Sequence, residues 1–199
     1  MFMYRRGAMF DWLKNQRAMD DCGKGSPVAH LDRLGVLGPH FLAVHVNYLW
    51  DFDAAVLARR KVSVVHCPRS HAFFGHRRFP RQELVAAGVN LCLGTDSLAS
   101  TRKERRGPPV LSLLAEMQAF ATANPGVTPA AVLRLATING ARALGHAGKL
   151  GELSPGALAD LITVPFAGNR DDAEEAVVFH QGEVASALIA GRWALPATP

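Results

Sequence analysis

Three short apolar runs, each followed by a helical pattern, constrain the fold of this chain more than any other feature. The runs cover residues 41–45 (FLAVH), 62–66 (VSVVH) and 89–96 (VNLCLGTD). The middle run is continuous and β-branched, as expected for a strand that is covered on both faces. Because helical patterns alternate with these runs, the sequence predicts parallel strands joined by crossover helices, which is an α/β fold.

The segments after the first two runs have the apolar spacing and end signals of helices. Residues 51–61 follow the first run, and Asp51 is a candidate N-cap because its carboxylate can accept hydrogen bonds from backbone N–H groups. Residues 81–88 follow the second run after a loop and end in Gly88, a residue that commonly closes a helix. The first two runs therefore read as successive β/α units.

Two longer helical patterns follow the third run. Residues 108–123 begin with two prolines, which are favoured at a helix start. Residues 128–145 begin with Thr128 and Pro129, an N-cap residue followed by a first-turn proline. The first forty residues predict one helix, a glycine-rich loop and a short second helix, with no strand of their own.

A change in sequence character near residue 147 predicts a boundary between two domains. Residues 1–146 hold the β/α units, whereas residues 147–199 contain a turn-rich Ser-Pro-Gly stretch and strand patterns. One strand is expected before residue 166, and two more around Gln181 and Gly182. The second part is therefore expected to be a small β element.

Composition indicates an ordinary globular chain. Of the 199 residues, 49% are hydrophobic and 20% are charged, which is enough apolar material for a core. No run of about 18 uncharged apolar residues occurs, and the start lacks the apolar core of a secretory signal. Three cysteines without regular spacing argue against a disulfide framework. We therefore expect a cytoplasmic protein that has no membrane partner.

The formal charge of +5 raises the question of nucleic-acid binding. Much of the excess lies in residues 59–61, 69–81 and 101–106, which lack interleaved aromatics or a groove-entering helix. Charged loops around a site, or plain solvated loops, explain these segments without a nucleic-acid partner. Strongly salt-dependent retention on DNA would be the mark of the alternative.

Each of the three expected strands ends in a residue that can bind a metal or move a proton, namely His45, His66 and Asp96. In parallel α/β folds the functional site lies at the carboxyl ends of the strands, so three such residues in succession predict a site there. Each has a plainer alternative. A strand-end histidine often hydrogen-bonds a neighbouring loop, and Asp96 could satisfy local backbone donors.

The other polar residues of this region carry less information. His71 and His76 are expected in a loop after the second strand, where loop contacts explain them better than metal ligation. Cys67 and Cys92 have the surroundings of small core residues. The number of histidines and cysteines in this region does not by itself indicate a metal cluster.

Five segments together resemble the C-terminal half of the metal-dependent amidohydrolase superfamily, in its branch of cytosine and guanine deaminases and chlorohydrolases. The resemblance implies the last three strands and helices of a (β/α)₈ TIM barrel, followed by part of a small β-sandwich. It also implies a hydrolase of non-peptide C–N bonds, and in this branch a deaminase of a heterocyclic amine. The segments are AVHVNYL, VSVVHCPRSH, AAGVNLCLGTDSLAS, VLRLATINGARALG and GKLGELSPGALADLITV.

The resemblance also assigns roles to single residues. His45 corresponds to the histidine that contacts the hydrolytic water and the substrate, and Asp96 to the aspartate that ligates the metal and takes the proton of the water. His66, Ser70 and His71 fall in the segment that shapes the pocket for a small heterocyclic substrate. The implied cofactor is one divalent metal; zinc is the first candidate, and iron also suits imidazole and carboxylate ligands.

Part of the family's metal site is absent from the sequence. The family's H-x-H pair does not occur, and the segment before residue 40 resembles the helix that follows the fifth barrel strand. We therefore expect a partial chain that lacks most metal ligands, does not retain the metal firmly and has little activity of its own. The alternative is a catalytically silent remnant that serves as a binding or interaction module, with its open strand edges paired with a second copy in a homo-oligomer or with a missing N-terminal half.

Overall fold

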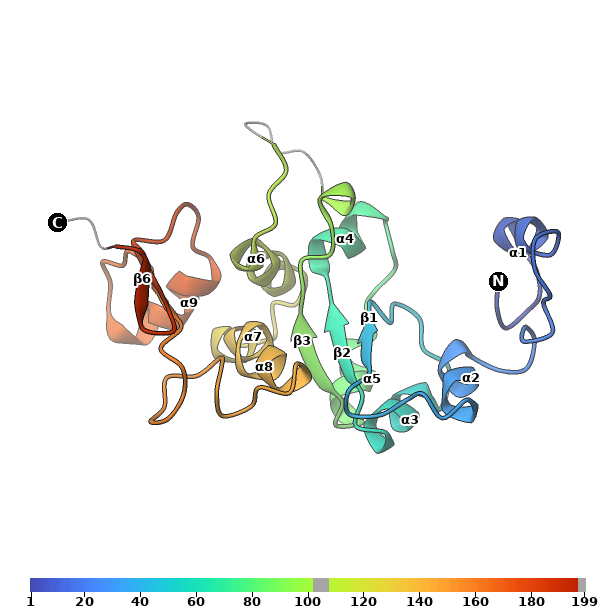
Figure 1. Cartoon of the computed structure of the whole chain (residues 1–199). Coiled ribbons are helices and arrows are strands. Elements are labelled where there is room, and N and C mark those ends of the chain that lie inside the picture. The colour runs from blue at the N-terminus through green and yellow to red at the C-terminus, as the bar shows by residue number, and fades with distance from the viewer. Residues whose placement is uncertain (102–107, 197–199) are drawn as a thin grey trace.

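A parallel three-stranded sheet forms the centre of the molecule (Figure 1). The computed structural model describes residues 1–101 and 108–196. Strands β1 (Leu42–Val44), β2 (Ser63–His66) and β3 (Asn90–Leu93) lie in the order β1-β2-β3, and both pairings are parallel. The predicted parallel α/β arrangement is therefore confirmed, although the strands are shorter than the apolar runs.

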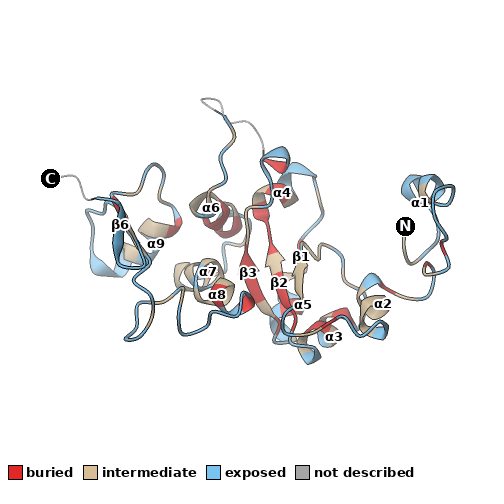
Figure 2. Ribbon diagram, viewed as in Figure 1, coloured by how far each residue is buried: buried red, intermediate tan, exposed pale blue. Residues whose placement is uncertain are grey.

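Short helices connect these strands and cover the sheet. Helix α3 (Asp53–Arg59) joins β1 to β2, while α4 (Pro68–Phe73) and α5 (Arg81–Ala86) join β2 to β3. The buried band along this sheet and its helices is visible in Figure 2. Complete burial of one large apolar side chain contributes roughly 1.5–3 kcal/mol to the free energy of folding. The fully buried residues of this cluster include Leu57, Val62, Val64, Leu84 and Leu91.

The capping prediction for α3 is wrong, whereas that for α5 is confirmed. Asp51 does not cap α3; the carboxylate of Asp53 instead accepts from the N–H of Trp50 at 2.9 Å. Asp53 is buried and also accepts from Ser26, so its position is fixed by tertiary contacts that the local sequence does not show. Gly88 ends α5 with φ of 79°, and its N–H donates to the carbonyl of Val85.

Three further helices pack against β3, and the first two of them form a second core with it. They are α6 (Leu113–Ala123), α7 (Pro129–Ala136) and α8 (Ile138–Ala143). Helix α6 starts four residues after the two prolines at 108 and 109, because the hydroxyl of Ser112 accepts from the N–H of Ala115 and caps the helix there. The expected cap of α7 is confirmed, since Thr128 accepts from the N–H of Ala131.

The pattern at residues 128–145 forms two helices, not the single helix that its spacing predicts. The break is at Thr137, whose φ and ψ are −122° and −93°. Its hydroxyl donates to the carbonyl of Leu133 at 2.7 Å, a contact that bends helices. The backbone of Gly151 packs against the same residue: a Cβ at position 151 would lie 2.7 Å from the carbonyl carbon of Thr137. Tertiary packing thus divides the helix.

Gly151 is expected to be intolerant of even one methyl group. Gly151→Ala should lower the free energy of unfolding by about 2–4 kcal/mol, because the Cβ would meet backbone atoms and φ is +76°. Gly140→Ala is the matched control, since position 140 lies in α8 with no atom within 4 Å of the added Cβ. That change should stabilise by roughly 0.5–1 kcal/mol. Urea unfolding of both variants measures the contrast, and equal effects would contradict it.

The C-terminal part contains a separate antiparallel sheet. Strands β4 (Leu161–Thr163), β5 (Ser186–Ile189) and β6 (Arg192–Leu195) lie in the order β4-β5-β6. The strand expected before residue 166 is therefore confirmed. The position of the domain boundary at residue 147 stays a prediction.

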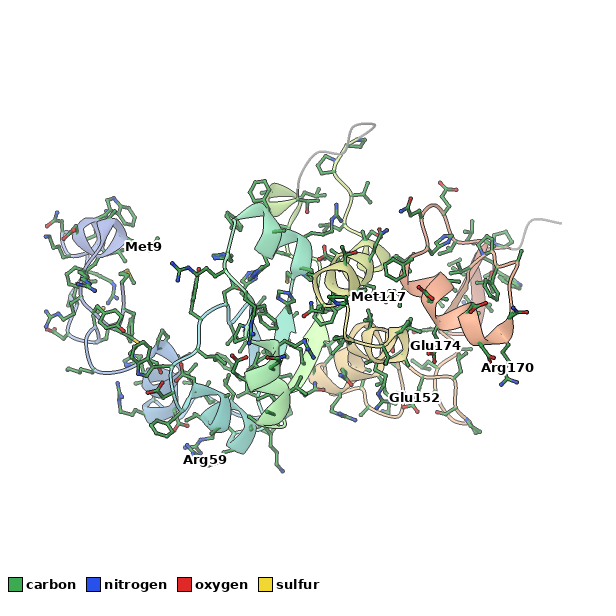
Figure 3. The ribbon with its side chains drawn as sticks, turned by 180° about the vertical axis from the view of Figure 1, so that it is seen from behind. Met9, Arg59, Met117, Glu152, Arg170 and Glu174 are labelled. Atoms are coloured by element: carbon green, nitrogen blue, oxygen red, sulfur yellow. The ribbon has the colours of Figure 1, made fainter. Side chains whose placement is uncertain are left out.

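Of the two strands expected around Gln181 and Gly182, the first is wrong and the second is confirmed as β5. Residues before it form η2 (Arg170–Asp172) and helix α9 (Ala173–Val178), and the hairpin of β5 and β6 turns at Ala190 and Gly191, both with positive φ. Val178 of α9 is fully buried and joins the core around α6 and α7. Figure 3 shows α9, with Glu174, beside α6, with Met117. Burial of an apolar helix face has overridden the strand propensity of this segment.

The first forty residues contain α1 (Ala8–Leu13) and α2 (Pro27–Arg33) and no strand, as predicted. Helix α2 packs on α3, whereas α1 lies away from the sheet (Figure 1). Met9 and Trp12 of α1 are exposed. Within residues 1–101 and 108–196, no helix is long and apolar enough to cross a bilayer.

Candidate active site

His45 and Asp96 come together at the carboxyl end of the parallel sheet. His45 directly follows β1, and Asp96 lies three residues after β3. The Nε2 atom of His45 is 3.8 Å from an Oδ atom of Asp96, and both side chains are partly exposed. Because β2 separates the two strands, the loops must bend toward each other over its end to make this approach. The structure thus brings together the two residues for which the sequence predicts catalysis.

Both residues have a backbone conformation that side chains rarely adopt. The φ angles of His45 and Asp96 are 72° and 54°, and Val46 follows with 45°. The left-handed region costs most residues of order 1 kcal/mol or more, and such strain gathers at functional sites. The neighbouring backbone is firmly held, since the N–H of His45 donates to the carbonyl of Val65 at 2.8 Å. Strain at both strand ends is therefore an independent sign of a functional site.

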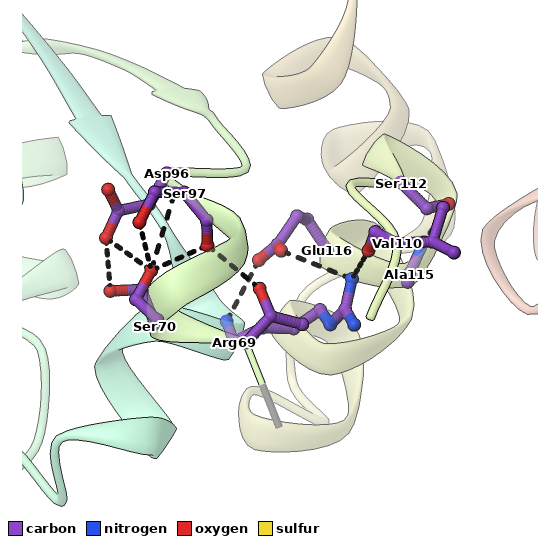
Figure 4. A network of polar contacts seen from close by, with 10 residues as sticks. Arg69, Ser70, Asp96, Ser97, Val110, Ser112, Ala115 and Glu116 are labelled. Carbon is purple, nitrogen blue, oxygen red and sulfur yellow. Dashed lines mark hydrogen bonds and ion pairs between the residues drawn. The ribbon is translucent and has the colours of Figure 1, made fainter. Parts of the chain in front are cut away.

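Two serine hydroxyls fix the carboxylate of Asp96. Ser70 Oγ donates to Asp96 at 2.6 Å (Figure 4). Ser100 Oγ donates to the same oxygen at 2.8 Å. These hydrogen bonds, followed by the nearby His45, lower the pKa of Asp96. Asp96 is accordingly held as a carboxylate, in an orientation that the surrounding backbone and hydroxyls determine.

A second carboxyl group supports this arrangement from behind. Glu116 of α6 is completely buried and accepts from the backbone N–H of Arg69 at 2.9 Å, while the Arg69 guanidinium lies 3.9 Å from it (Figure 4). Burial raises the pKa of Glu116 to about 7, although both contacts with Arg69 oppose the shift. Since Arg69 precedes Ser70 in α4, Glu116 anchors the helix that carries a hydroxyl to Asp96.

His66 is a buried neutral ring beneath the site. It is 4% exposed and stacks on Phe79, with ring centroids 3.8 Å apart and an interplanar angle of 12°. Burial, followed by the neighbouring His71 and His45, lowers the pKa of His66 to about 3. Its Nδ1 atom has no hydrogen-bond partner within the described residues. The imidazole of His66 is therefore uncharged at neutral pH.

His71 lies in helix α4, where the sequence predicted a loop, because Pro68 begins a helix directly after β2. Its Nδ1 atom is 2.9 Å from Oδ1 of Asn47, which follows β1. Burial lowers the pKa of His71. His76, which does lie in the following loop, contacts the hydroxyl of Tyr48 at 3.1 Å. Both histidines therefore join the segment after β2 to the loop after β1.

Sequence reasoning missed three members of this constellation: Asn47, Ser100 and Glu116. Ser100 could have been found from its position four residues after Asp96. The segment from Ser97 forms a capped 3₁₀ turn, which brings residues at this spacing together. Glu116 carried none, because a glutamate in an amphipathic helix normally faces solvent. The cysteine interpretation is confirmed, since Cys22, Cys67 and Cys92 are all unpaired and buried. Burial raises the pKa of Cys67 to about 12, so this thiol is not a metal-ready thiolate.

The described residues provide only part of the ligand set of a metal site. A catalytic zinc ion normally has three protein ligands and one open position. Within residues 1–101 and 108–196, no group of three or more His, Cys, Asp or Glu side chains could hold a metal ion. Asp96 provides a carboxylate of suitable chemistry, and His45 stands beside it. A complete metal site therefore needs ligands in addition to these.

Comparison with known protein families identifies the family of this chain. Residues 15–193 match the family described as the amidohydrolase family. This chain belongs to the amidohydrolase family. A 5-methylthioadenosine/S-adenosylhomocysteine deaminase of Syntrophobacter fumaroxidans is 45% identical over 147 residues, covering 70% of this chain and 32% of the relative. A 5′-deoxyadenosine deaminase of Methanoregula boonei is 41% identical over 162 residues, covering 76% and 35%. The amidohydrolase chain thus spans about a third of the length of these relatives.

Solved structures confirm the fold. An adenosine deaminase of Xanthomonas campestris with bound zinc has a TM-score of 0.72 and 32% identity, covering 85% of this chain and 40% of the other. An aminofutalosine deaminase of Helicobacter pylori has a TM-score of 0.80 at 20% identity, covering 98% and 48%. The three parallel strands of this amidohydrolase are therefore part of a TIM barrel, as the sequence predicted.

Proposed function

We propose that this amidohydrolase chain supplies the proton-transfer residues of a hydrolytic deaminase that acts on adenosine-type nucleosides. The approach of His45 to Asp96 at the carboxyl end of the sheet carries the proposal, because it unites a fixed carboxylate and an imidazole. The substrate class follows from relatives named as deaminases of 5′-substituted adenosines. We place the enzyme in the cytoplasm, where its cysteines remain reduced.

The proposed reaction replaces the exocyclic amine of the purine by oxygen. Asp96 accepts a proton from the water that adds to the amine-bearing carbon, and then passes it to the departing nitrogen, so that the C–N bond breaks and ammonia leaves. His45 donates toward the water or the ring and stabilises the charge that develops there. A divalent ion, which we propose to be zinc with iron as the alternative, would lower the pKa of the water, with Asp96 among its ligands.

The neighbouring residues divide into two proposed roles. We place His71 at the substrate pocket, where its ring can contact a purine face, and His66 beneath it, where the buried ring shapes the floor of the pocket. Ser70 is 2% exposed and its hydroxyl is engaged by Asp96. We therefore propose that Ser70 reaches the substrate only through the carboxylate that it orients.

A chimera tests the proposed function. Residues 40–199 would replace the matching segment of the Xanthomonas campestris adenosine deaminase, whose remaining part would provide the rest of the barrel. We expect the chimera to deaminate adenosine or 5′-methylthioadenosine, to lose turnover with a chelator and to regain it with zinc. The 199-residue chain by itself should show no turnover that zinc restores, because the residues that the structure describes present too few ligands.

Absorbance loss near 265 nm follows the conversion of adenine to hypoxanthine rings, and metal analysis shows whether each preparation contains zinc. The unmodified Xanthomonas campestris enzyme is the positive control. A folded, zinc-loaded chimera that leaves every adenosine-type nucleoside unchanged would refute the proposal. Zinc-dependent turnover by the 199-residue chain alone would refute the expected need for further ligands.

A further inference from the structure

A cavity of about 680 Å³ lies at the end of the parallel sheet opposite to His45 and Asp96. Its floor includes Ser63 and Asn90, the first residues of β2 and β3. Helices α5, α7 and α8 contribute its walls, around the lower ends of these strands in Figure 1. Its volume falls within the range of small-molecule sites. The cavity is therefore large enough for a ligand and is separate from the proposed active site.

The charge of the cavity is entirely positive. Lys61, which follows α3, Arg81 of α5, Arg134 of α7 and Arg142 of α8 all line it, and its lining contains no Asp or Glu. Within the part of the chain that the structure describes, none of these four cations has a carboxylate partner; Arg81 donates from Nε to the amide of Asn124. Four cations, from three helices and the turn after α3, line one concave surface and concentrate the field that attracts an anion.

A hydrogen-bonded floor fixes the wall that carries Arg142. The amide of Asn90 donates to the hydroxyl of Ser63 and to the carbonyl of Asn139, both at 3.0 Å. Asn139 of α8 in turn donates to the carbonyl of Leu91 at 2.9 Å. Asn90 Oδ1 is buried without a partner among the described residues, which leaves an acceptor at the cavity floor. Helix α8 is thus tied to the strands, and the cavity is not a gap between loose segments.

Apolar side chains complete the lining. Val85, Val127 and Leu135, which are partly or fully exposed, are among the residues that border the cavity. A purely inorganic anion would leave this apolar surface uncovered, whereas an apolar molecule would leave four cations without a counter-charge. We propose that the cavity binds a small organic phosphate, with its phosphate between the arginines and its ring or chain against the apolar wall.

The experiment uses phenyl phosphate, inorganic phosphate and phenol as probes of the full 199-residue chain. Titration calorimetry at low salt should show saturable one-to-one binding of phenyl phosphate. Inorganic phosphate should bind about tenfold more weakly, because it lacks the ring, and phenol should not bind in the same concentration range. None of the probes is an adenosine-type substrate, so the result is independent of the proposed deaminase function.

The double variant Arg134→Gln with Arg142→Gln should weaken phenyl phosphate binding about tenfold or more. Arg170→Gln with Arg192→Gln is the matched control, since it removes the same charge from exposed positions outside the cavity. Binding in that control should change less than about twofold. Equal losses in the two variants, or no saturable binding by the unmodified chain, would overturn the proposal. If the first variant does not fold, Arg142→Gln against Arg142→Lys decides: only the glutamine should weaken binding.

Discussion

Asp96→Asn in the zinc-loaded chimera is expected to lower kcat by about 10³-fold or more. The change is nearly isosteric, and the amide oxygen can still accept from Ser70 or Ser100. What it removes is the charge and the basic oxygen, and loss of a general base alone costs roughly 10²–10⁴-fold. Steady-state rates with adenosine, together with the zinc content of each preparation, separate a loss of proton transfer from a loss of metal.

Ser70→Ala is the partner variant, because it leaves the carboxylate and removes one of its two hydroxyl donors. It should lower kcat about tenfold and move the acid limb of the pH profile to higher pH, since the hydrogen bond from Ser70 is the largest cause of the lowered pKa of Asp96.

A folded Asp96→Asn chimera that keeps its zinc and retains normal turnover would remove Asp96 from the mechanism.

The stability of the chain is expected to depend on two buried groups with opposite pH dependence. The pKa of Glu116 is raised from 4.5 to about 7, so the folded state keeps a proton that the unfolded chain releases. Stability from this group is complete below about pH 4.5 and is lost as pH rises to about 7, a loss of about 3 kcal/mol. Glu116 therefore makes the protein less stable at neutral pH.

His66 acts in the other direction. Its pKa is lowered from 6.5 to about 3, so the unfolded chain binds a proton that the buried ring does not. Its contribution is complete above about pH 6.5 and is lost as pH falls toward 3, by about 4–5 kcal/mol. Between about pH 4.5 and 6.5 the two slopes oppose each other. The contributions of these two groups should therefore largely cancel in that interval.

Single replacements should expose each slope. Glu116→Gln keeps an acceptor for the N–H of Arg69 and removes the ionisation, so stability should rise steadily up to about pH 6.5 and then level off. His66→Gln should leave the opposite trend, with stability falling between about pH 4.5 and 7. Urea unfolding at four pH values from 4.5 to 7.5 measures both. Parallel pH profiles in the two variants would show that neither group titrates as its burial implies.

Local sequence signals predicted the parts of the fold that depend on neighbours in the chain. The apolar runs gave three parallel strands, Thr128 gave the start of α7, and Gly88 gave the end of α5. These features rest on burial patterns and on caps, which act over a few residues. The sequence did not predict the helix break at Thr137 or the helix at 173–178. Both depend on distant positions, namely Gly151 and the core around Val178.

The candidate site divides in the same way. Residue type and strand position were sufficient to select His45 and Asp96, because a parallel sheet brings the carboxyl ends of its strands to one edge. Only the tertiary structure showed the left-handed backbone at both residues, the two hydroxyls on Asp96, and Glu116 behind Arg69. Ser70 and Glu116 lie on helices that are distant from Asp96 in the sequence, so no local spacing encodes their contacts; only Ser100, four residues after Asp96, carried a local signal.

The sequence by itself thus determined the order and direction of the strands and the residues at their ends, since hydrophobic periodicity fixes which segments are buried. The tertiary structure decided the electrostatics: how far apart those residues lie, which carboxyl group has a lowered pKa and which has a raised one, and where four cations line a cavity. Coulombic and desolvation energies depend on distances between segments and on the exclusion of water, and both exist only once the chain has folded.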